Sequence, residues 1–286
     1  MKNDDLILSP EDYAEPRCLL CDEPFGAAPS VKPVPQRRII EKMDEYMSRR
    51  DYAGAERHLL YWLEEARLGG DLRGELLVNN ELIGHYRKTQ NRDRALESIS
   101  EALRLVDELD FDGTVSAGTT YTNAATAYNA FGEDAKALEL FEKAKTVYES
   151  APATKPELLG GLYNNMALTC VSLKLFDRAF SLYDKALEAM KKVPGGELEQ
   201  AITLLNMANA LEARDGMEEA ESGIFDLLDK ASELLTDTTA PRNGYYAFVL
   251  EKCAPTFSYY GYFADAQRFS GIAEAIYKKE NGDEGA

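Results

Sequence analysis

The sequence predicts an all-α fold built from stacked antiparallel helix pairs, an α-solenoid, and three observations support this prediction. Apolar residues recur with helical spacing through most of the chain, alanines recur at a fixed interval, and short breaks separate the helical segments. Self-similarity at a period of roughly 20–50 residues is typical of solenoids, in which each repeat packs only against its neighbours.

The repeat is clearest in three segments that align without gaps and begin at Val78, Thr122 and Asn164. The alanines of these segments are 42 residues apart, at positions 95, 137 and 179 and again at positions 102, 144 and 186. Weaker copies place Ala55, Ala220 and Ala266 at the position of Ala95. The sequence therefore predicts about six units between residues 36 and 280.

Each unit is expected to contain two helices. The first carries apolar residues at i, i+3, i+4 and i+7, as in the series Tyr163, Met166, Ala167 and Cys170. A short break such as "FGED" follows, and the second helix carries an Ala, a large residue four positions later and another Ala. The small alanines allow two helices to approach closely, and the large residue fills the adjacent gap.

This pattern resembles the tetratricopeptide repeat, in which an aromatic residue, Leu-Gly and Tyr precede an Ala-x3-Phe sequence and a later Ala. The resemblance covers residues 36–280, and the step of 42 residues is longer than the usual one of about 34. Repeats of this longer kind are similar to those of kinesin light chains and bacterial peptide-sensing regulators. The resemblance implies a right-handed superhelix whose first helices line a concave groove.

Asparagines recur in the first helices, although Asn is a poor residue for a helix interior. Rotation by about 100° per residue places Asn165 opposite the core stripe of its helix, and Asn123 and Asn206 take the same place in the adjacent units. Because an amide both donates and accepts hydrogen bonds, such a row could hold a peptide backbone, as groove asparagines do in the proteins it resembles. The alternative is that these three asparagines are solvated residues of the helix surface or form hydrogen bonds between neighbouring units.

Further candidates for the groove lie beside this row. Asn80, Asn164 and Asn209 could add amide contacts, and the basic residues Arg87, Lys88 and Lys252 are expected to face the groove. A ligand carboxylate near Arg87 is one interpretation, and a solvated, charged helix end is the other.

The composition excludes several classes of partner. A net charge of -18 argues against nucleic acid and against an anionic membrane, because their phosphates would be repelled. No apolar run of about 18 residues predicts a transmembrane helix, and the start of the sequence does not have the pattern of a signal peptide. We therefore expect a cytoplasmic protein with reduced cysteines.

One metal-like motif is present, in which Cys18 and Cys21 have the spacing of half a zinc site. A structural zinc needs four ligands, and the sequence has no second pair with this spacing, so we expect no metal and no cofactor. The alternative is a zinc ion at Cys18 and Cys21 that bridges two chains or takes further ligands from a partner. Phosphate-binding, zinc-protease and nucleophile-elbow motifs are also missing from the sequence.

The ends of the chain differ from the repeats. Residues 1–35 hold six of the eleven prolines and are expected to form a flexible arm, which could lie in the groove and block it. Residues 281–286 are expected to be a frayed tail. Tyr259, Tyr260 and Tyr262 in the last unit are candidates for a homodimer contact.

These observations favour a non-catalytic scaffold that binds a protein or peptide in its groove. One alternative is a peptide-sensing regulator that acts through a protein partner, and a less favoured one is an enzyme on a helical-repeat scaffold. Because these repeats serve many pathways, the fold does not name the partner.

Overall fold

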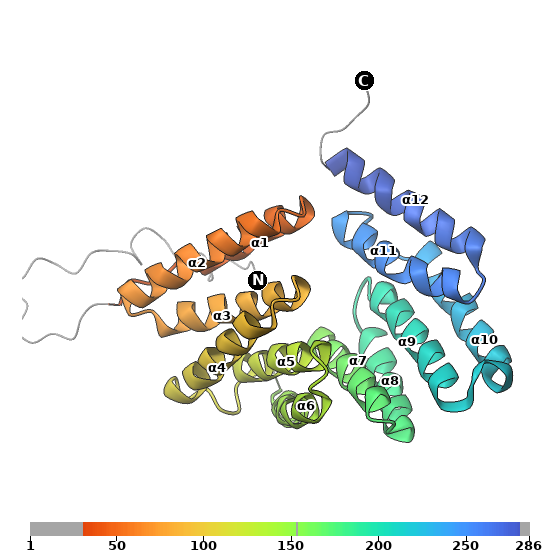
Figure 1. Ribbon diagram of the computed structural model, residues 1–286, viewed down its shortest axis with the longest axis horizontal. Helices are drawn as coiled ribbons and strands as arrows, with labels where there is room; N and C mark the ends of the chain where they lie inside the picture. The colour runs from red at the N-terminus through yellow and green to blue at the C-terminus, as the bar shows by residue number, and fades with distance from the viewer. Residues whose placement is uncertain (1–30, 153, 281–286) are drawn as a thin grey trace, which may run out of the picture. The chain divides into compact units, whose positions relative to one another are not determined.

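The computed structural model of the protein describes residues 31–152 and 154–280, which form twelve α-helices and no β-strand (Figure 1). The helices are α1 (Gln36–Ser48), α2 (Tyr52–Gly69), α3 (Leu72–Lys88), α4 (Arg92–Glu108), α5 (Val115–Ala130), α6 (Asp134–Ser150), α7 (Pro156–Ser172), α8 (Phe176–Met190), α9 (Glu197–Asp215), α10 (Met217–Thr236), α11 (Gly244–Tyr259) and α12 (Phe263–Glu280).

Consecutive helices pack as six pairs, from α1 and α2 to α11 and α12, so the predicted all-α fold of paired helices is confirmed. The helices divide into two compact units, residues 1–110 with α1–α4 and residues 111–286 with α5–α12. Each unit is described separately below.

The core follows the repeat. Ala137, Phe141 and Ala144 on α6 are fully buried, as are the equivalent residues Ala179, Tyr183 and Ala186 on α8. The core stripe predicted for the first helix of this pair, including Met166 and Cys170, is buried as well. The period of the alanines therefore marks the positions where the helices approach each other.

Five of the six pairs have a three-residue turn whose middle residue has a positive φ, between 56° and 86°: Arg50, Gln90, Gly132, Lys174 and Gly261. The exception is the turn between α9 and α10, which consists of Gly216 alone, with φ 86° and ψ 162°. A left-handed residue just after a helix allows the following backbone N–H groups to bond to its last carbonyls. Asn91 N, for example, donates to Tyr86 O at 2.8 Å.

The end of the proline-rich segment is bound to the turn between α2 and α3. Lys32 N donates to Gly69 O at 2.8 Å, and Val34 N donates to Asp71 Oδ2 at 2.9 Å. Asp71 also caps α3, since its Oδ1 accepts from Gly74 N at 2.9 Å. Residues 1–30 and 281–286, which include most of the predicted arm and all of the predicted tail, lie outside the described residues.

No helix in the described ranges combines the length and the apolar character needed to span a membrane.

Candidate ligand-binding face of the first helices

In the second unit the first helices α5, α7, α9 and α11 lie next to one another in this order (Figure 1). We define the first-helix face as the side of these helices that is turned away from the core and that contains the predicted groove asparagines. Asn123, Asn165 and Asn206 are half-buried there and Asn209 is exposed, whereas their neighbours Ala124, Met166 and Ala208 are buried.

Two asparagines of this face are hydrogen-bonded to each other. Asn206 Nδ2 on α9 donates to Asn164 Oδ1 on α7 at 3.0 Å. Asn206 therefore bonds to Asn164, which was expected to lie beside the row of Asn123, Asn165 and Asn206. It does not bond to Asn165, its equivalent on α7. Because each amide has two N–H donors and two acceptor lone pairs, both side chains keep capacity for a ligand.

The amide of Asn165 is half-buried and makes no hydrogen bond to the described part of the chain. Gly161 lies one turn before it on the same side of α7, and a Cβ atom added at this glycine would meet open space. Leu168 is half-buried one turn later. The middle of α7 therefore presents the Asn165 amide between two uncharged residues, Gly161 and Leu168, and the surface over Gly161 is open.

Asn209 contacts the last pair of helices. The hydroxyl of Tyr260 lies 3.0 Å from Asn209 Oδ1 and 2.8 Å from Glu212 Oε2, which links α11 to α9. Of the three tyrosines proposed for a homodimer contact, Tyr260 is buried and not available for one, whereas Tyr259 is exposed and Tyr262 half-buried. Tyr260 is buried because it packs in the interface between these first helices.

An aromatic pair extends the face onto α11, and the sequence analysis missed it. Tyr245 and Phe248 have exposed fractions of 51% and 41%, and their rings stack with centroids 6.3 Å apart. The hydroxyl of Tyr245 donates to Glu199 Oε1 on α9 at 2.5 Å. Burial and this carboxylate raise the pKa of Tyr245, so its hydroxyl stays protonated. Lys252, one turn beyond Phe248, is exposed as well.

The spacing of Tyr245, Phe248 and Lys252, at i, i+3 and i+7, is a signal that could have identified this part of the face. It was overlooked because the last unit is one of the weaker copies of the repeat.

The first unit holds the remaining predicted residues, all on α3. Asn80 Nδ2 donates to Leu76 O in its own helix at 3.1 Å. Lys88 Nζ lies 5.3 Å from the centroid of the Tyr52 ring on α2. Arg87 is half-buried, its guanidinium makes no ion pair in the described part of the chain, and burial lowers its pKa. An arginine in this state favours an incoming carboxylate.

Two titratable groups on α3 are perturbed. Burial, with the nearby charge of Asp44, raises the pKa of Glu81. Burial lowers the pKa of His85, opposed by the charge of Glu56, and His85 Nδ1 has no hydrogen-bond partner in the described part of the chain. Both shifts are in the direction of the neutral form.

The zinc candidates Cys18 and Cys21 lie outside the described residues. Within the described ranges, no three His, Cys, Asp or Glu side chains are grouped so that they could hold a metal ion. Cys170 and Cys253 are buried free thiols, and burial raises their pKa values to about 11 and about 12. These two thiols are therefore unreactive core residues.

Solved structures that are similar to this chain share little sequence with it. One similar structure, from Podosopora anserina, is described as kinesin light chain nearly identical TPR-like repeats (17% identity, TM-score 0.48, 71% of this chain and 94% of that chain). Another is BtubC (BKLC) from P. vanneervenii (18%, 0.46, 87% and 94%). A third is a tetratricopeptide repeat protein from Parabacteroides merdae ATCC 43184 (18%, 0.40, 84% and 93%). No curated protein matches the sequence significantly.

The sequence profile of the tetratricopeptide repeat matches residues 75–150 and 158–222. These ranges extend from α3 into α10 and include the three segments in which the alanines recur every 42 residues. Over these residues, the chain is a tetratricopeptide repeat protein.

Proposed function

We propose that this protein is a non-catalytic scaffold that binds an extended peptide segment of another protein on the first-helix face. The observation that carries the proposal is the half-buried Asn165 amide, which makes no hydrogen bond to the described chain and lies beside the linked amides of Asn164 and Asn206. Proteins of this family generally bind protein partners, which supports a binding role.

The spacing of the helices suits an extended backbone. Packed helices lie roughly 8–10 Å apart, and an extended peptide rises about 3.3 Å per residue. A peptide that crosses the face would therefore pass one first helix for about every three of its residues. Asn123, Asn165 and Asn206 would each meet a peptide N–H or C=O group, which gives binding without strict sequence preference.

Side-chain preference would come from α11. The exposed rings of Tyr245 and Phe248 offer a flat surface for an aromatic or cationic side chain, and Glu199 adds a negative charge beside them. Together with a net charge of -18, this arrangement favours a peptide that carries Lys or Arg. Lys252 and Asn209 would contribute at the margins of the face.

The first unit offers a separate contact in this proposal. The half-buried guanidinium of Arg87 would bind a carboxylate of the partner, with Lys88 and Asn80 on the same helix as neighbouring polar groups. The proposal includes a cytoplasmic location, which the two buried free cysteines support because they suit a reducing compartment.

A peptide-display selection on the intact protein tests this function. A synthetic copy of an enriched peptide is titrated against the wild type and against Gly161→Tyr, which fills the open space over α7. Gly271→Tyr is the matched control, because Gly271 on α12 also faces open space but lies away from the first-helix face.

We expect Gly161→Tyr to weaken binding by at least about tenfold, a loss of roughly 1.4 kcal/mol, and Gly271→Tyr to bind as the wild type does. Equal affinity for all three proteins, or a selection that enriches no peptide, would contradict the proposal. A change in the radius of gyration on binding would favour the peptide-sensing alternative.

A further inference from the structure

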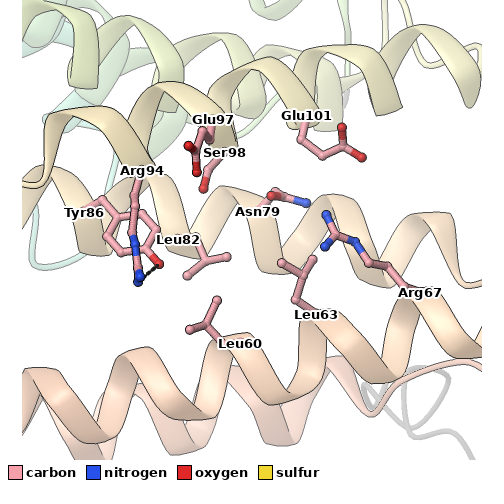
Figure 2. Close-up of a pocket in the computed structure, with 10 residues that line it drawn as sticks. All are labelled: Leu60, Leu63, Arg67, Asn79, Leu82, Tyr86, Arg94, Glu97, Ser98 and Glu101. Carbon is pink, nitrogen blue, oxygen red and sulfur yellow. Dashed lines mark hydrogen bonds between the residues drawn. The ribbon is translucent and has the colours of Figure 1, made fainter.

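A pocket of about 460 Å³ lies between α2 and α4 in the first unit, with α3 as its floor (Figure 2). Leu60 and Leu63 on α2 and Leu82 on α3 form its apolar part, and Glu97 and Ser98 on α4 lie across from them. The pocket opens between two second helices, so it is distinct from the first-helix face.

A small side chain on α4 helps to create this pocket. The repeat alanines at positions 55, 95, 137 and 179 identify α6 and α8 as the equivalents of α2 and α4. Ser98 follows its alanine by three residues, and Leu182 on α8 has the same place. Leu182 is 5% exposed, so its side chain fills this position between α6 and α8. Ser98 is too small to do so between α2 and α4, which leaves space beside the leucines.

A shifted ion pair leaves the leucine surface uncovered. Arg178 on α8 pairs with Glu142 on α6, and the equivalents of these residues are Arg94 and Leu60. Because Leu60 has no charge, Arg94 pairs instead with Glu56, one turn earlier on α2. Leu60 therefore remains 41% exposed at the mouth of the pocket.

The charge that is left over at the rim is negative. Arg67 Nε donates to Glu75 Oε1 at 2.8 Å, and Glu101 Oε1 accepts from Arg104 Nη2 at 2.6 Å. Glu97 is exposed and forms no ion pair within the described ranges. The pocket therefore combines an apolar wall with one uncompensated carboxylate, and a ligand with an aliphatic group and a positive charge is complementary to it.

We propose that this pocket binds a segment of a protein partner in which a leucine-like side chain lies close to a Lys or Arg. The aliphatic side chain would pack on Leu60 and Leu63, in the space that Leu182 fills between α6 and α8. The basic side chain would pair with Glu97. The net charge of -18 would attract such a segment as it approaches.

This inference goes beyond the proposed function and does not depend on it, because the pocket and the first-helix face belong to different units. A partner could occupy either surface without the other.

A peptide-display selection with a depletion step tests the inference on the full chain. A random library is first depleted on Leu60→Arg and then selected on the wild type. Leu60→Arg places a cation in the mouth of the pocket, and its exposed position makes it compatible with folding. Peptides that bind the first-helix face bind both proteins and are removed, so failure of this inference is distinguishable from failure of the proposed function.

Synthetic copies of the enriched peptides are then titrated against the wild type and the variants. Leu68→Arg is the matched control, because Leu68 is an exposed leucine of the same helix that does not line the pocket. Ser98→Leu provides a second, independent variant, since it places on α4 the side chain that Leu182 supplies on α8. Glu97→Gln removes the carboxylate alone.

We expect the enriched peptides to carry an aliphatic residue within about four positions of a Lys or Arg. Leu60→Arg and Ser98→Leu should each weaken binding by at least about tenfold, and Leu68→Arg should bind as the wild type does. Glu97→Gln should weaken it by about two- to fivefold, as expected for one exposed ion pair.

Three results would overturn the proposal. One is a selection that enriches no peptide after depletion, and another is a set of enriched peptides without basic residues. The third is an equal loss of affinity for Leu60→Arg and Leu68→Arg, which would show that a general charge effect and not the pocket determines binding.

Discussion

Asn206 on α9 donates a hydrogen bond of 3.0 Å to Asn164 on α7, which lies 42 residues earlier in the chain. This bond ties together two neighbouring repeats on the face that we propose for ligand binding. It gives these asparagines a structural role that is compatible with binding, because one amide bond leaves other donors and acceptors unused.

The first prediction concerns this bond. Asn164→Ala and Asn206→Ala should each change the free energy of unfolding by about 1 kcal/mol or less, because a hydrogen bond loss is partly offset by the helix propensity of Ala. The double variant should show a coupling energy of at least about 0.5 kcal/mol in urea denaturation. Strict additivity would mean that the two amides do not interact in solution.

The second prediction concerns a hydroxyl group in the core. Tyr183 on α8 is fully buried, and within the described chain its hydroxyl has no hydrogen-bond partner. Tyr183→Phe removes this unsatisfied group and should stabilise the protein by about 1 kcal/mol. Tyr246→Phe is the matched control and should destabilise it by about 1 kcal/mol, since Tyr246 donates to Leu235 O at 3.0 Å. Urea midpoints that move the same way for both variants would contradict this account.

The third prediction uses two glycines that both face open space. Gly132 has a φ of 76° in the turn between α5 and α6, whereas Gly161 lies inside helix α7. Gly132→Ala should destabilise the protein by about 1 kcal/mol because of backbone strain, and Gly161→Ala should stabilise it by about 0.5–1 kcal/mol through helix propensity. Thermal unfolding of the two variants measures both effects, and a stabilising Gly132→Ala would be inconsistent with the left-handed turn.

The fourth prediction concerns the pH dependence of stability. Burial lowers the pKa of His85 below its usual value of 6.5 in the folded state. As the pH falls below about 6.5, the unfolded chain therefore binds a proton that the folded chain does not, and stability decreases by up to about 1.4 kcal/mol per pH unit until the folded pKa is reached.

The matched variant for this test is His85→Leu, which cannot take up the proton. Glu81, whose pKa is raised, stays in both proteins, so its contribution cancels in the comparison. Urea unfolding at several values between pH 7.5 and 5 should give a steeper loss of stability for the wild type than for the variant. Parallel curves would show that His85 does not titrate differently in the two states.

The repeat architecture could be predicted from the sequence because it depends on local periodicity. Alanines 42 residues apart identified the close contacts between helices, and Ala137, Ala144, Ala179 and Ala186 are all fully buried. The left-handed turn was harder to recognise, since Gln90 and Lys174 occupy positions where Gly132 and Gly261 show the usual residue.

The details of the candidate face could not be predicted in the same way. Asn164 and Asn165 are separated by about 100° around the helix, and the packing of large side chains between α7 and α9 decides which of them meets Asn206. The pocket lined by Leu60, Leu63 and Leu82 depends on the space left between α2, α3 and α4, which helical periodicity does not determine.

The most direct test of the central claim is the dissociation constant of a display-selected peptide for a triple variant, Asn123→Ala, Asn165→Ala and Asn206→Ala. Its matched control replaces Thr146, Ser181 and Ser222 by Ala, three exposed polar residues on the second helices of the same pairs. With each lost hydrogen bond worth about 0.5–1.5 kcal/mol, the asparagine variant should bind at least about tenfold more weakly, with its helical content unchanged. The control should keep the wild-type affinity. Equal affinities for the two variants would contradict a ligand held by these amides and would move the binding site away from the first-helix face.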